Sequence, residues 1–451
     1  MINVVGRPPL DAARVRLCTF EHVLCNTSSM PCELLPCHTE ELREEAMVNG
    51  TVPITLENLG QIRRDPCCSA ENFVLDSCDD AARELESAFG GASEIWNDTE
   101  MTDSSTDASV AVVCDLTTVD EGRDVDGLAR VAARLGDGVA VCFGASLDAA
   151  SVARDAVLPG TLLQQALERQ LVVGVDVAAD VTRNFAAGAP AAPRAAFVGP
   201  LRPAFTWDGK IHCKSADFFY VHAAAAVASR RGAPVVVVLP AGNRHDLERR
   251  ARAVLAIAAQ PGLEPGYGLL GPISTPPTWI FRAARLDDLA DLTQAVLHLG
   301  ENVFAVADGW DRPCDRGPPP PRVRDWNVDA RLFPMSRVLV GAGVRYRTQL
   351  RKYGGAGYDA GIKTVCDAGY GSASWNEAAP SLAWYRPPKK RPADVVELQC
   401  SRCGRSFEVR RGHHYGKFDY VYCGRGCLDA HRDSSFDASE VTGPTASAQG
   451  V

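Results

Sequence analysis

The chain has 451 residues, which is more than one ordinary hydrophobic core takes and enough for a large domain with a small one. Its formal net charge is −9, so the composition excludes a general electrostatic coat for nucleic acids. No apolar run reaches the roughly 20 residues of a membrane-spanning helix, and the first residues have no apolar segment typical of a secretory signal.

Residues 15 to 341 alternate short β-rich segments with segments of helical periodicity. The predicted strands are 15–19, 109–116, 139–143, 195–199, 234–239, 267–271, 302–308 and 337–341. The clearest helices are 79–89, 124–136, 161–171, 217–230, 245–259 and 286–299. Eight strands with interleaved helices favour an α/β fold of the (β/α)8 TIM-barrel type. The alternative, an open doubly wound sheet, needs a glycine-rich turn where this chain has Phe20-Glu21-His22.

Composition predicts how the chain is organised around this barrel. The predicted parts are the barrel at 1–384, a Pro-rich basic linker at 385–397, a zinc finger at 398–434 and a disordered tail at 435–451. Acidic residues 91–108 predict a loop within the barrel, and the prolines of 311–325 predict a stiff excursion. The basic run at 389–391 is either a nuclear import signal, which would place the protein in the nucleus, or part of a solvated linker. The linker is the simpler interpretation.

Sixteen cysteines fall into two groups. Twelve precede residue 400 at uneven spacings, which fits free, buried thiols in a reducing compartment. We therefore expect a cytoplasmic protein. The other four lie close together near the C-terminus and form a separate motif.

The functional face of a TIM barrel lies where its strands end and the βα loops begin. Metal-dependent hydrolysis at this face needs several histidine and carboxylate side chains around one or two ions. Only His22, of nine histidines, directly follows a predicted strand, and Glu21 precedes it. The predicted ends of strands four, five, six and eight carry proline, leucine, glycine and alanine, whose side chains have no lone pairs.

Several long segments of the chain resemble the phosphotriesterase-related proteins of the amidohydrolase superfamily. They are PITLENLGQIRRDP at 53–66, SAENFVLDS at 69–77, DLTTVDEGRDVDGLARVAARLG at 115–136, RTQLRKYGGAGYDAG at 347–361 and WNEAAPSLAWYRPP at 375–388. The resemblance covers roughly residues 1–390 in collinear order. It implies a (β/α)8 barrel with a binuclear metal centre, usually zinc, that hydrolyses phosphotriesters, lactones or acylated amines.

The transfer of the family's metal ligands to this chain fails at most positions. The family's Thr-His-Glu-His after strand one corresponds to Thr19-Phe20-Glu21-His22, so one histidine is replaced by Phe20. The other ligand positions fall on Pro200, on Leu239, near Pro272, and on Ala342 and Gly343. Zinc normally needs at least three protein ligands. The resemblance therefore predicts a pseudoenzyme without a barrel metal, in which Glu21 and His22 are remnants.

Two alternatives to a pseudoenzyme stay open. One is a residual zinc-dependent hydrolase for ester, lactone or N-acyl bonds, built around His22 and Glu21. The other is a non-catalytic sensor of a small anion, because Arg202 follows predicted strand four and Arg345 and Arg347 follow predicted strand eight. Loops after the last strands of such barrels often hold phosphate groups.

The C-terminal cysteines form two pairs, Cys400-x2-Cys403 and Cys423-x3-Cys427. Two pairs at such spacings are typical of a zinc site. Residues 407–409 and 418–422 predict the two strands of a hairpin, and the second pair opens a predicted helix, so the segment resembles a treble-clef finger with a MYND-like second half. We expect one structural zinc on the four cysteines, with His431 as an alternate ligand or a hydrogen-bond partner of a ligand.

The finger also suggests the kind of partner. Basic and aromatic residues between its cysteine pairs are compatible with a nucleic acid or an acidic peptide. Fingers of this shape often bind proteins and the chain is acidic overall, so a protein partner is favoured and nucleic acid is the weaker alternative. No membrane partner is expected.

Overall fold

The computed structural model of the chain divides into two compact units, Met1–Pro387 and Pro388–Val451, and each is described by itself. The structure describes residues 2–11, 14–27, 53–64, 69–90, 110–148, 152, 161–176, 188, 192–212, 215–240, 242–260, 276–283, 289–307, 337–361, 395–399, 406–410, 415–417 and 420–422. The predicted loop at 91–108, the excursion at 311–325 and the tail at 435–451 lie outside these residues.

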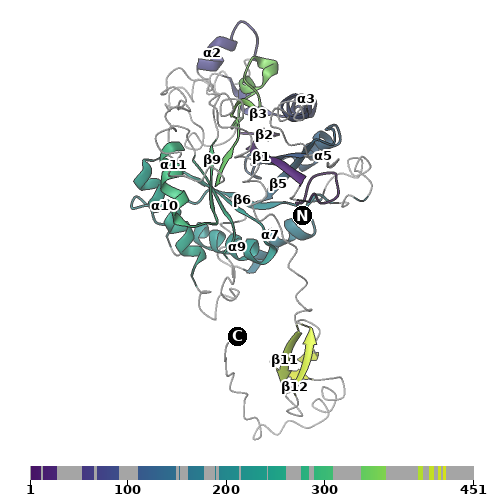
Figure 1. Ribbon diagram of the computed structural model, residues 1–451, viewed down its shortest axis with the longest axis vertical. Coiled ribbons are helices and arrows are strands. Elements are labelled where there is room, and N and C mark those ends of the chain that lie inside the picture. Colours follow the sequence, from purple (N-terminus) through teal and green to yellow (C-terminus); the bar gives the residue numbers. More distant parts are fainter. Residues whose placement is uncertain are drawn as a thin grey trace, which may run out of the picture. The chain divides into compact units, whose positions relative to one another are not determined.

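Eight parallel strands form the centre of the first unit (Figure 1). They are β1 (Val15–Glu21), β4 (Val110–Asp115), β5 (Val139–Ala145), β6 (Phe197–Leu201), β7 (Val235–Leu239), β8 (Trp279–Ala283), β9 (Val303–Ala307) and β10 (Val338–Val340). Their order in the sheet is their order in the chain, and every pair of neighbours is parallel. The sheet is a nearly closed barrel, which confirms the predicted TIM-barrel fold.

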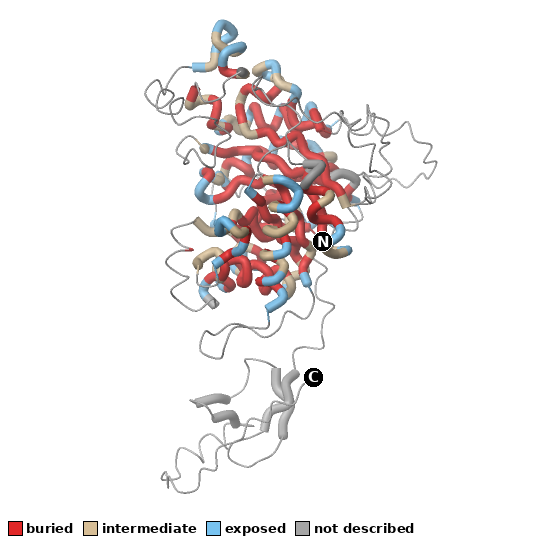
Figure 2. Tube along the Cα trace, turned by 90° about the vertical axis from the view of Figure 1, so that its left-hand side faces the viewer, coloured by how far each residue is buried: buried red, intermediate tan, exposed pale blue. Residues whose placement is uncertain are grey.

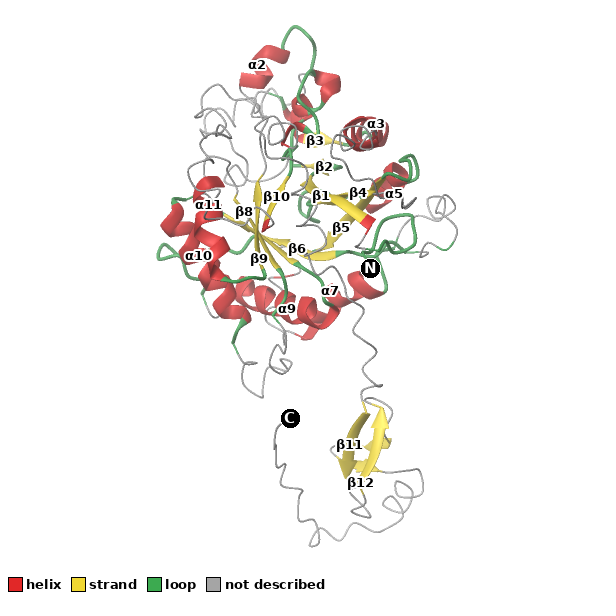
Figure 3. Ribbon diagram, in the orientation of Figure 1, coloured by secondary structure: helices red, strands yellow, loops and turns green. Residues whose placement is uncertain are grey.

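Helices surround these strands (Figure 3). They are α3 (Cys78–Leu85), α5 (Val125–Ala132), α7 (Thr161–Val172), α9 (Ala216–Arg231), α10 (Arg244–Ala258) and α11 (Leu289–Val296), with a short α2 (Leu59–Arg64) after the first strand. Side-chain oxygens of Ser77, Asp124, Ser215 and Asn243 accept hydrogen bonds from the first turns of α3, α5, α9 and α10. Within the described ranges, no helix is both long and apolar enough to cross a bilayer.

Short elements complete the first unit. The two-residue strands β2 (Cys25–Asn26) and β3 (Val74–Leu75) pair antiparallel. The 3-10 helices are η4 (Ala70–Phe73), η7 (Leu297–Leu299), η10 (Arg347–Gln349) and η11 (Arg351–Tyr353), and η5 (Glu86–Gly90) is a π-helical turn after α3.

The core has two layers that follow the alternation of side chains along each strand. Alternate residues such as Cys114, Val236 and Ile280 form a cluster of their own, which fills the barrel. The intervening residues pack against the helices, and Figure 2 shows the resulting buried interior. Five cysteines lie among the described residues and all five are free, which confirms the prediction of free thiols for these positions.

One predicted strand is wrong. The sixth strand of the barrel is β8 (Trp279–Ala283), whereas residues 267–271 lie outside the described residues. Both segments are short apolar runs, and periodicity does not distinguish between such runs. The correction moves the strand-six ligand position away from Pro272 and brings Arg282 to the end of a barrel strand.

The second unit contains two antiparallel strand pairs. Strand β11 (Val395–Gln399) pairs with β12 (Ser406–Arg410), and β13 (Tyr415–Lys417) pairs with β14 (Tyr420–Tyr422). The prediction that 407–409 and 418–422 pair with each other is therefore wrong. In the sequence, Cys400 and Cys403 fall between β11 and β12, so the predicted zinc knuckle joins two adjacent strands.

A substitution at Gly144 in β5 tests how tightly the strands of the barrel pack. A Cβ atom at this position would lie 2.0 Å from the Gly199 carbonyl oxygen and 2.4 Å from the Phe197 ring. Gly144→Ala should therefore lower the free energy of unfolding by about 1–3 kcal/mol or more, measured by urea denaturation. Gly60→Ala in α2 is the control, because nothing lies within 4 Å of its new Cβ and alanine favours a helix. Equal stability of the two variants would contradict the close approach of β5 and β6.

Candidate functional site

The carboxyl ends of parallel strands meet at one mouth of the barrel. Cys18 and Phe20 of β1 belong to the cluster that fills the barrel, and His22 continues their alternation. On β8, Ile280 belongs to the same cluster and Arg282 continues it in the same way. The sequence pattern thus directs His22 and Arg282 towards each other, and both are almost fully buried, at 1% and 2% exposure.

Glu21 joins the two ends of the barrel. Its Oε1 accepts hydrogen bonds from the Ala342 amide at 2.6 Å and the Thr19 hydroxyl at 2.8 Å. Its Oε2 accepts from the amides of Gly343 at 3.0 Å and Val344 at 3.1 Å. Three consecutive amides after β10 therefore surround a carboxylate at the end of β1. The carboxylate of Glu21 therefore has a structural use in the barrel.

His22 lies in a chain of polar contacts. Its Nε2 is 3.5 Å from the Arg282 guanidinium, and its Nδ1 is 3.3 Å from the Thr117 hydroxyl. Because a guanidinium only donates, Nε2 faces it as the acceptor and Nδ1 carries the proton. The Thr117 hydroxyl then accepts from His22 and donates to Asp115 Oδ1 at 2.8 Å. The lone pair of His22 is thus directed at a cation.

The environment keeps His22 neutral. Burial lowers the pKa of His22 well below its usual value, and the positive charges of Arg345, Arg282 and Arg202 lower it further. The carboxylate of Glu121 acts in the opposite direction but does not reverse the shift. The electrostatic potential around His22, at the mouth of the barrel, is therefore positive.

Asp115, at the end of β4, is fully buried. Its Oδ1 accepts from the Val23 amide at 2.9 Å and from Thr117, whereas its Oδ2 has no hydrogen-bond partner in the part of the chain that the structure describes. Burial raises the pKa of Asp115 to about 7, against the hydrogen bonds and the Arg123 charge, which lower it. This carboxyl group changes its protonation near neutral pH.

Glu121 and Arg202 form a partly buried ion pair. The Arg202 guanidinium donates to Glu121 Oε1, and the side chains are 19% and 2% exposed. Burial alone would raise the pKa of Glu121, but the nearby arginine charges, above all that of Arg202, lower it to about 2. Glu121 Oε2 also accepts from the Thr118 amide at 2.9 Å. Glu121 is thus an ionised carboxylate whose two oxygens are both engaged.

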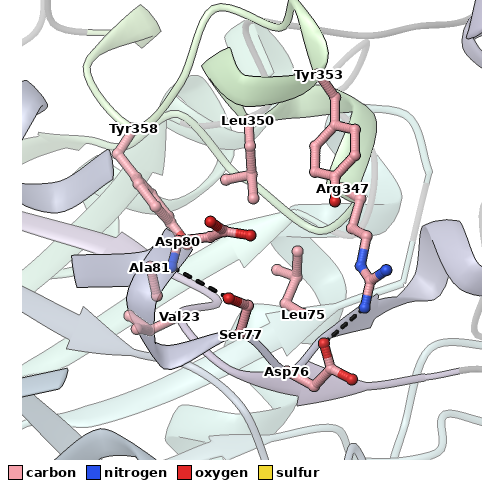
Figure 4. Close-up of a pocket in the computed structure, with 10 residues that line it drawn as sticks. All are labelled: Val23, Leu75, Asp76, Ser77, Asp80, Ala81, Arg347, Leu350, Tyr353 and Tyr358. Carbon is pink, nitrogen blue, oxygen red and sulfur yellow. Dashed lines mark hydrogen bonds and ion pairs between the residues drawn. The ribbon is translucent and has the colours of Figure 1, made fainter. Parts of the chain in front are cut away.

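The three arginines of the predicted anion site differ in their surroundings. Arg202 and Arg345 both act on His22, so these two lie at the mouth. Arg347 lines a small pocket on Val23, Leu75 and Tyr358, shown in Figure 4. Its guanidinium is held by Glu71, by Asp76 at 2.6 Å and by the Val74 carbonyl at 2.6 Å. We therefore leave Arg347 out of the anion site.

Apart from His22, the described positions at which the sequence resemblance predicts metal ligands carry no donor side chains. Phe20 is buried in the barrel against Phe197, with ring centroids 6.2 Å apart, and Leu239 is buried at the end of β7. Pro200 lies within β6, and Ala342 and Gly343 contribute only amides to Glu21. Among the described residues, no group of three or more His, Cys, Asp or Glu side chains is arranged to hold a metal ion. The donors within the described ranges alone do not make up a binuclear metal centre.

Three charged residues of the site were not among the residues predicted from the sequence. Arg282 was missed because the sixth strand was placed too early in the chain, although a lone charge in the apolar run WIFRA is a usable signal. Asp115 and Glu121 lie in a segment that resembles the family, and their burial is a tertiary property. The predicted zinc ligands Cys400, Cys403, Cys423 and Cys427, with His431, lie outside the described residues.

Comparisons with known proteins agree with the two-part architecture. A family model described as the Vms1-associating treble clef domain matches residues 397–439. This confirms the predicted treble clef and implies that the segment binds zinc. No curated protein sequence matches the chain significantly.

The solved structures similar to this chain include the following three proteins. A resiniferatoxin-binding protein from Rhodobacter sphaeroides is 17% identical with a TM-score of 0.54, over 85% of this chain and 95% of that chain. A phosphotriesterase homology protein from Escherichia coli is 15% identical with a TM-score of 0.49, over 81% and 95%. A lactonase from Listeria monocytogenes is 12% identical with a TM-score of 0.49, over 86% and 100%. At these identities the likeness shows the fold alone, and the TIM-barrel fold itself is established by the eight parallel strands.

Glu21→Gln tests the closure of the barrel. The amide group of glutamine places a donor against backbone N–H groups that now meet a carboxylate oxygen. We expect the free energy of unfolding to fall by about 2–4 kcal/mol in urea denaturation, because buried hydrogen bonds to a charge are lost. Glu86→Gln is the matched control, since Glu86 is exposed and accepts one bond, from the Gly136 amide. A loss no larger than that of the control would contradict this role.

The raised pKa of Asp115 predicts how the stability of the chain depends on pH. The pKa is 3.8 in the unfolded reference and about 7 in the folded chain, so this group's contribution to stability is fully present below about pH 4 and is lost as pH rises through about 7. Asp115→Asn removes this titration. The free energy of unfolding of the variant relative to the wild type should rise by up to about 4 kcal/mol between about pH 4 and pH 8. Chemical denaturation at both pH values measures the difference.

The control for this experiment is Asp137→Asn. Asp137 is exposed and lies 4.0 Å from Arg7, so its replacement should change stability little and equally at both pH values. If the Asp115 variant also shows a constant difference, Asp115 is ionised throughout this range and the assignment is overturned.

Proposed function

We propose that the chain is a phosphotriesterase-like barrel that has lost its catalytic metal site and serves as a binding scaffold, joined to a zinc finger that docks a protein. The single observation that carries this proposal is the buried guanidinium of Arg282 beside Nε2 of His22. In the resembled family, the histidine at this place in the chain is a metal ligand. A fixed positive charge beside it opposes the binding of a divalent cation.

The neighbouring carboxylates support the same proposal. Glu21 is engaged by three amides and a hydroxyl, and Glu121 by Arg202 and the Thr118 amide. Carboxylates used in this way have few lone pairs left for a metal ion, and freeing them would break buried hydrogen bonds. The substitutions at Phe20, Pro200, Leu239, Ala342 and Gly343 remove the remaining donors. A residual hydrolase would need ligands from elsewhere in the chain.

The zinc finger supplies the second half of the proposed function. In the sequence, Cys400 and Cys403 fall between β11 and β12, and Cys423 directly follows β14. We propose that these residues and Cys427 hold one structural zinc, with His431 next to it. Four protein ligands close a zinc site to substrate, so the role of this zinc is to stabilise the fold. The family description, which names association with Vms1, supports a protein as the partner.

A count of zinc per chain tests the proposal. Elemental analysis of the purified full-length chain should find one zinc, and Cys400→Ser combined with Cys403→Ser should remove it, because two ligands do not hold zinc tightly. Cys78→Ser is the control, since Cys78 is a free thiol of the first unit and its loss should leave the zinc content unchanged.

The competing hydrolase gives a different result in the same experiment. It requires two or three zinc ions per chain and turnover of a lactone or an aryl ester that His22→Ala abolishes. A wild-type chain with zinc beyond the finger would therefore refute the loss of the barrel metal.

A further inference from the structure

Three arginines reach the mouth of the barrel from different strands. Arg202 directly follows β6, Arg282 lies near the end of β8, and Arg345 lies five residues beyond the end of β10. Arg282 is 2% exposed and the side chain of Arg202 is 19% exposed, and Arg345 is also partly exposed. The positive charges of all three lower the pKa of His22, so we treat them as one electropositive cluster around this residue.

Two glutamates at the mouth, Glu21 and Glu121, face the three arginines of this cluster. Glu121 pairs with Arg202, Glu21 is enclosed by amides, and the charge of Asp115 acts on Arg123. Arg123 itself is fixed by the Gly144 carbonyl and the Ser146 hydroxyl. A surplus of positive charge therefore stays at the mouth.

Two donors of the cluster lack partners in the described parts of the chain. The guanidinium of Arg345 makes no hydrogen bond or ion pair with a described residue, although its backbone amide is held by Gln349 at 2.7 Å. The Nε of Arg202 is buried and also has no hydrogen-bond partner there. A buried donor without an acceptor is costly, and such a donor is satisfied when a ligand supplies the acceptor.

We propose that the mouth of the barrel binds a small oxyanion, the carboxylate or phosphate group of a metabolite-sized ligand, between Arg345 and Arg202 and above His22. The planar guanidinium fork matches the paired oxygens of both groups. The chain's net charge of −9 opposes a long polyanion, so the ligand is a small molecule. This inference rests on the proposed function, because a metal in the barrel would itself determine what binds there.

Titration of the full-length chain with inorganic phosphate and, separately, with malonate tests the inference. The melting temperature is measured at constant ionic strength balanced with sodium chloride, and isothermal calorimetry gives the affinity. We expect at least one of the two anions to raise the melting temperature beyond chloride and to saturate. Whichever anion binds more tightly identifies the head group as phosphate or carboxylate.

Arg345→Gln is the decisive variant. Because the Arg345 guanidinium has no bond to a described residue, its loss should leave folding intact and weaken anion binding roughly 10-fold or more. Arg169→Gln, an exposed arginine of α7, is the control and should keep the wild-type affinity. The inference is overturned if neither anion binds saturably, or if both variants bind alike.

Zinc measured in the same samples separates this inference from the proposed function. Absent anion binding with one zinc per chain would refute the anion site and leave the scaffold proposal intact. If the chain holds a second zinc in the barrel, and anion binding is lost when that zinc is removed, both the anion site and the scaffold proposal are refuted.

Discussion

The barrel mouth depends on the hydrogen bonds that the carboxylate of Glu21 accepts. This carboxylate lies at the end of the first strand and accepts three consecutive amides from the segment that follows the last strand. Gly341 permits this approach, because a Cβ atom there would lie 2.8 Å from the Phe20 carbonyl oxygen. A residue that resembles part of a metal motif thus holds the two ends of the sheet together. The glycine and alanine residues after β10 contribute their backbone to this closure.

Closure of this kind also organises the charges around His22. The backbone of His22 is held by the Tyr358 hydroxyl at 3.0 Å, and its ring is placed between Thr117 and Arg282. Burying a guanidinium costs free energy unless acceptors and opposite charges surround it. A buried arginine in a barrel strand therefore affects the stability of the fold and is not a neutral residue there. On the proposed interpretation, it turns a mouth that suits cations into one that suits anions.

The sequence predicts the barrel well because periodicity reports directly on burial. Seven strands lie where alternating or continuous apolar segments indicate them, and the caps Ser77, Asp124 and Ser215 set the starts of three helices. The sixth strand was misplaced because two short apolar runs compete within the same interval. The site is harder to predict, since the contact between His22 and Arg282 joins residues 260 positions apart. Local patterns give the side of the strand on which each lies, but the pairing arises only when the sheet curves into a barrel.

On the proposed interpretation, zinc binding belongs to the second unit and ligand binding to the barrel, whereas an active metalloenzyme combines both in one site. Thiolates suit zinc, and on the proposed interpretation the four cysteines of the finger form a closed site that needs little support from a core. The barrel has a large core of its own. On the proposed interpretation, its stability therefore gives no reason to preserve metal ligands once catalysis is lost. The same reasoning explains why Glu21 is retained beside a replaced histidine: its carboxylate closes the sheet whether or not an ion is present. Structural use, rather than chemistry, is thus sufficient to account for the part of the motif that remains.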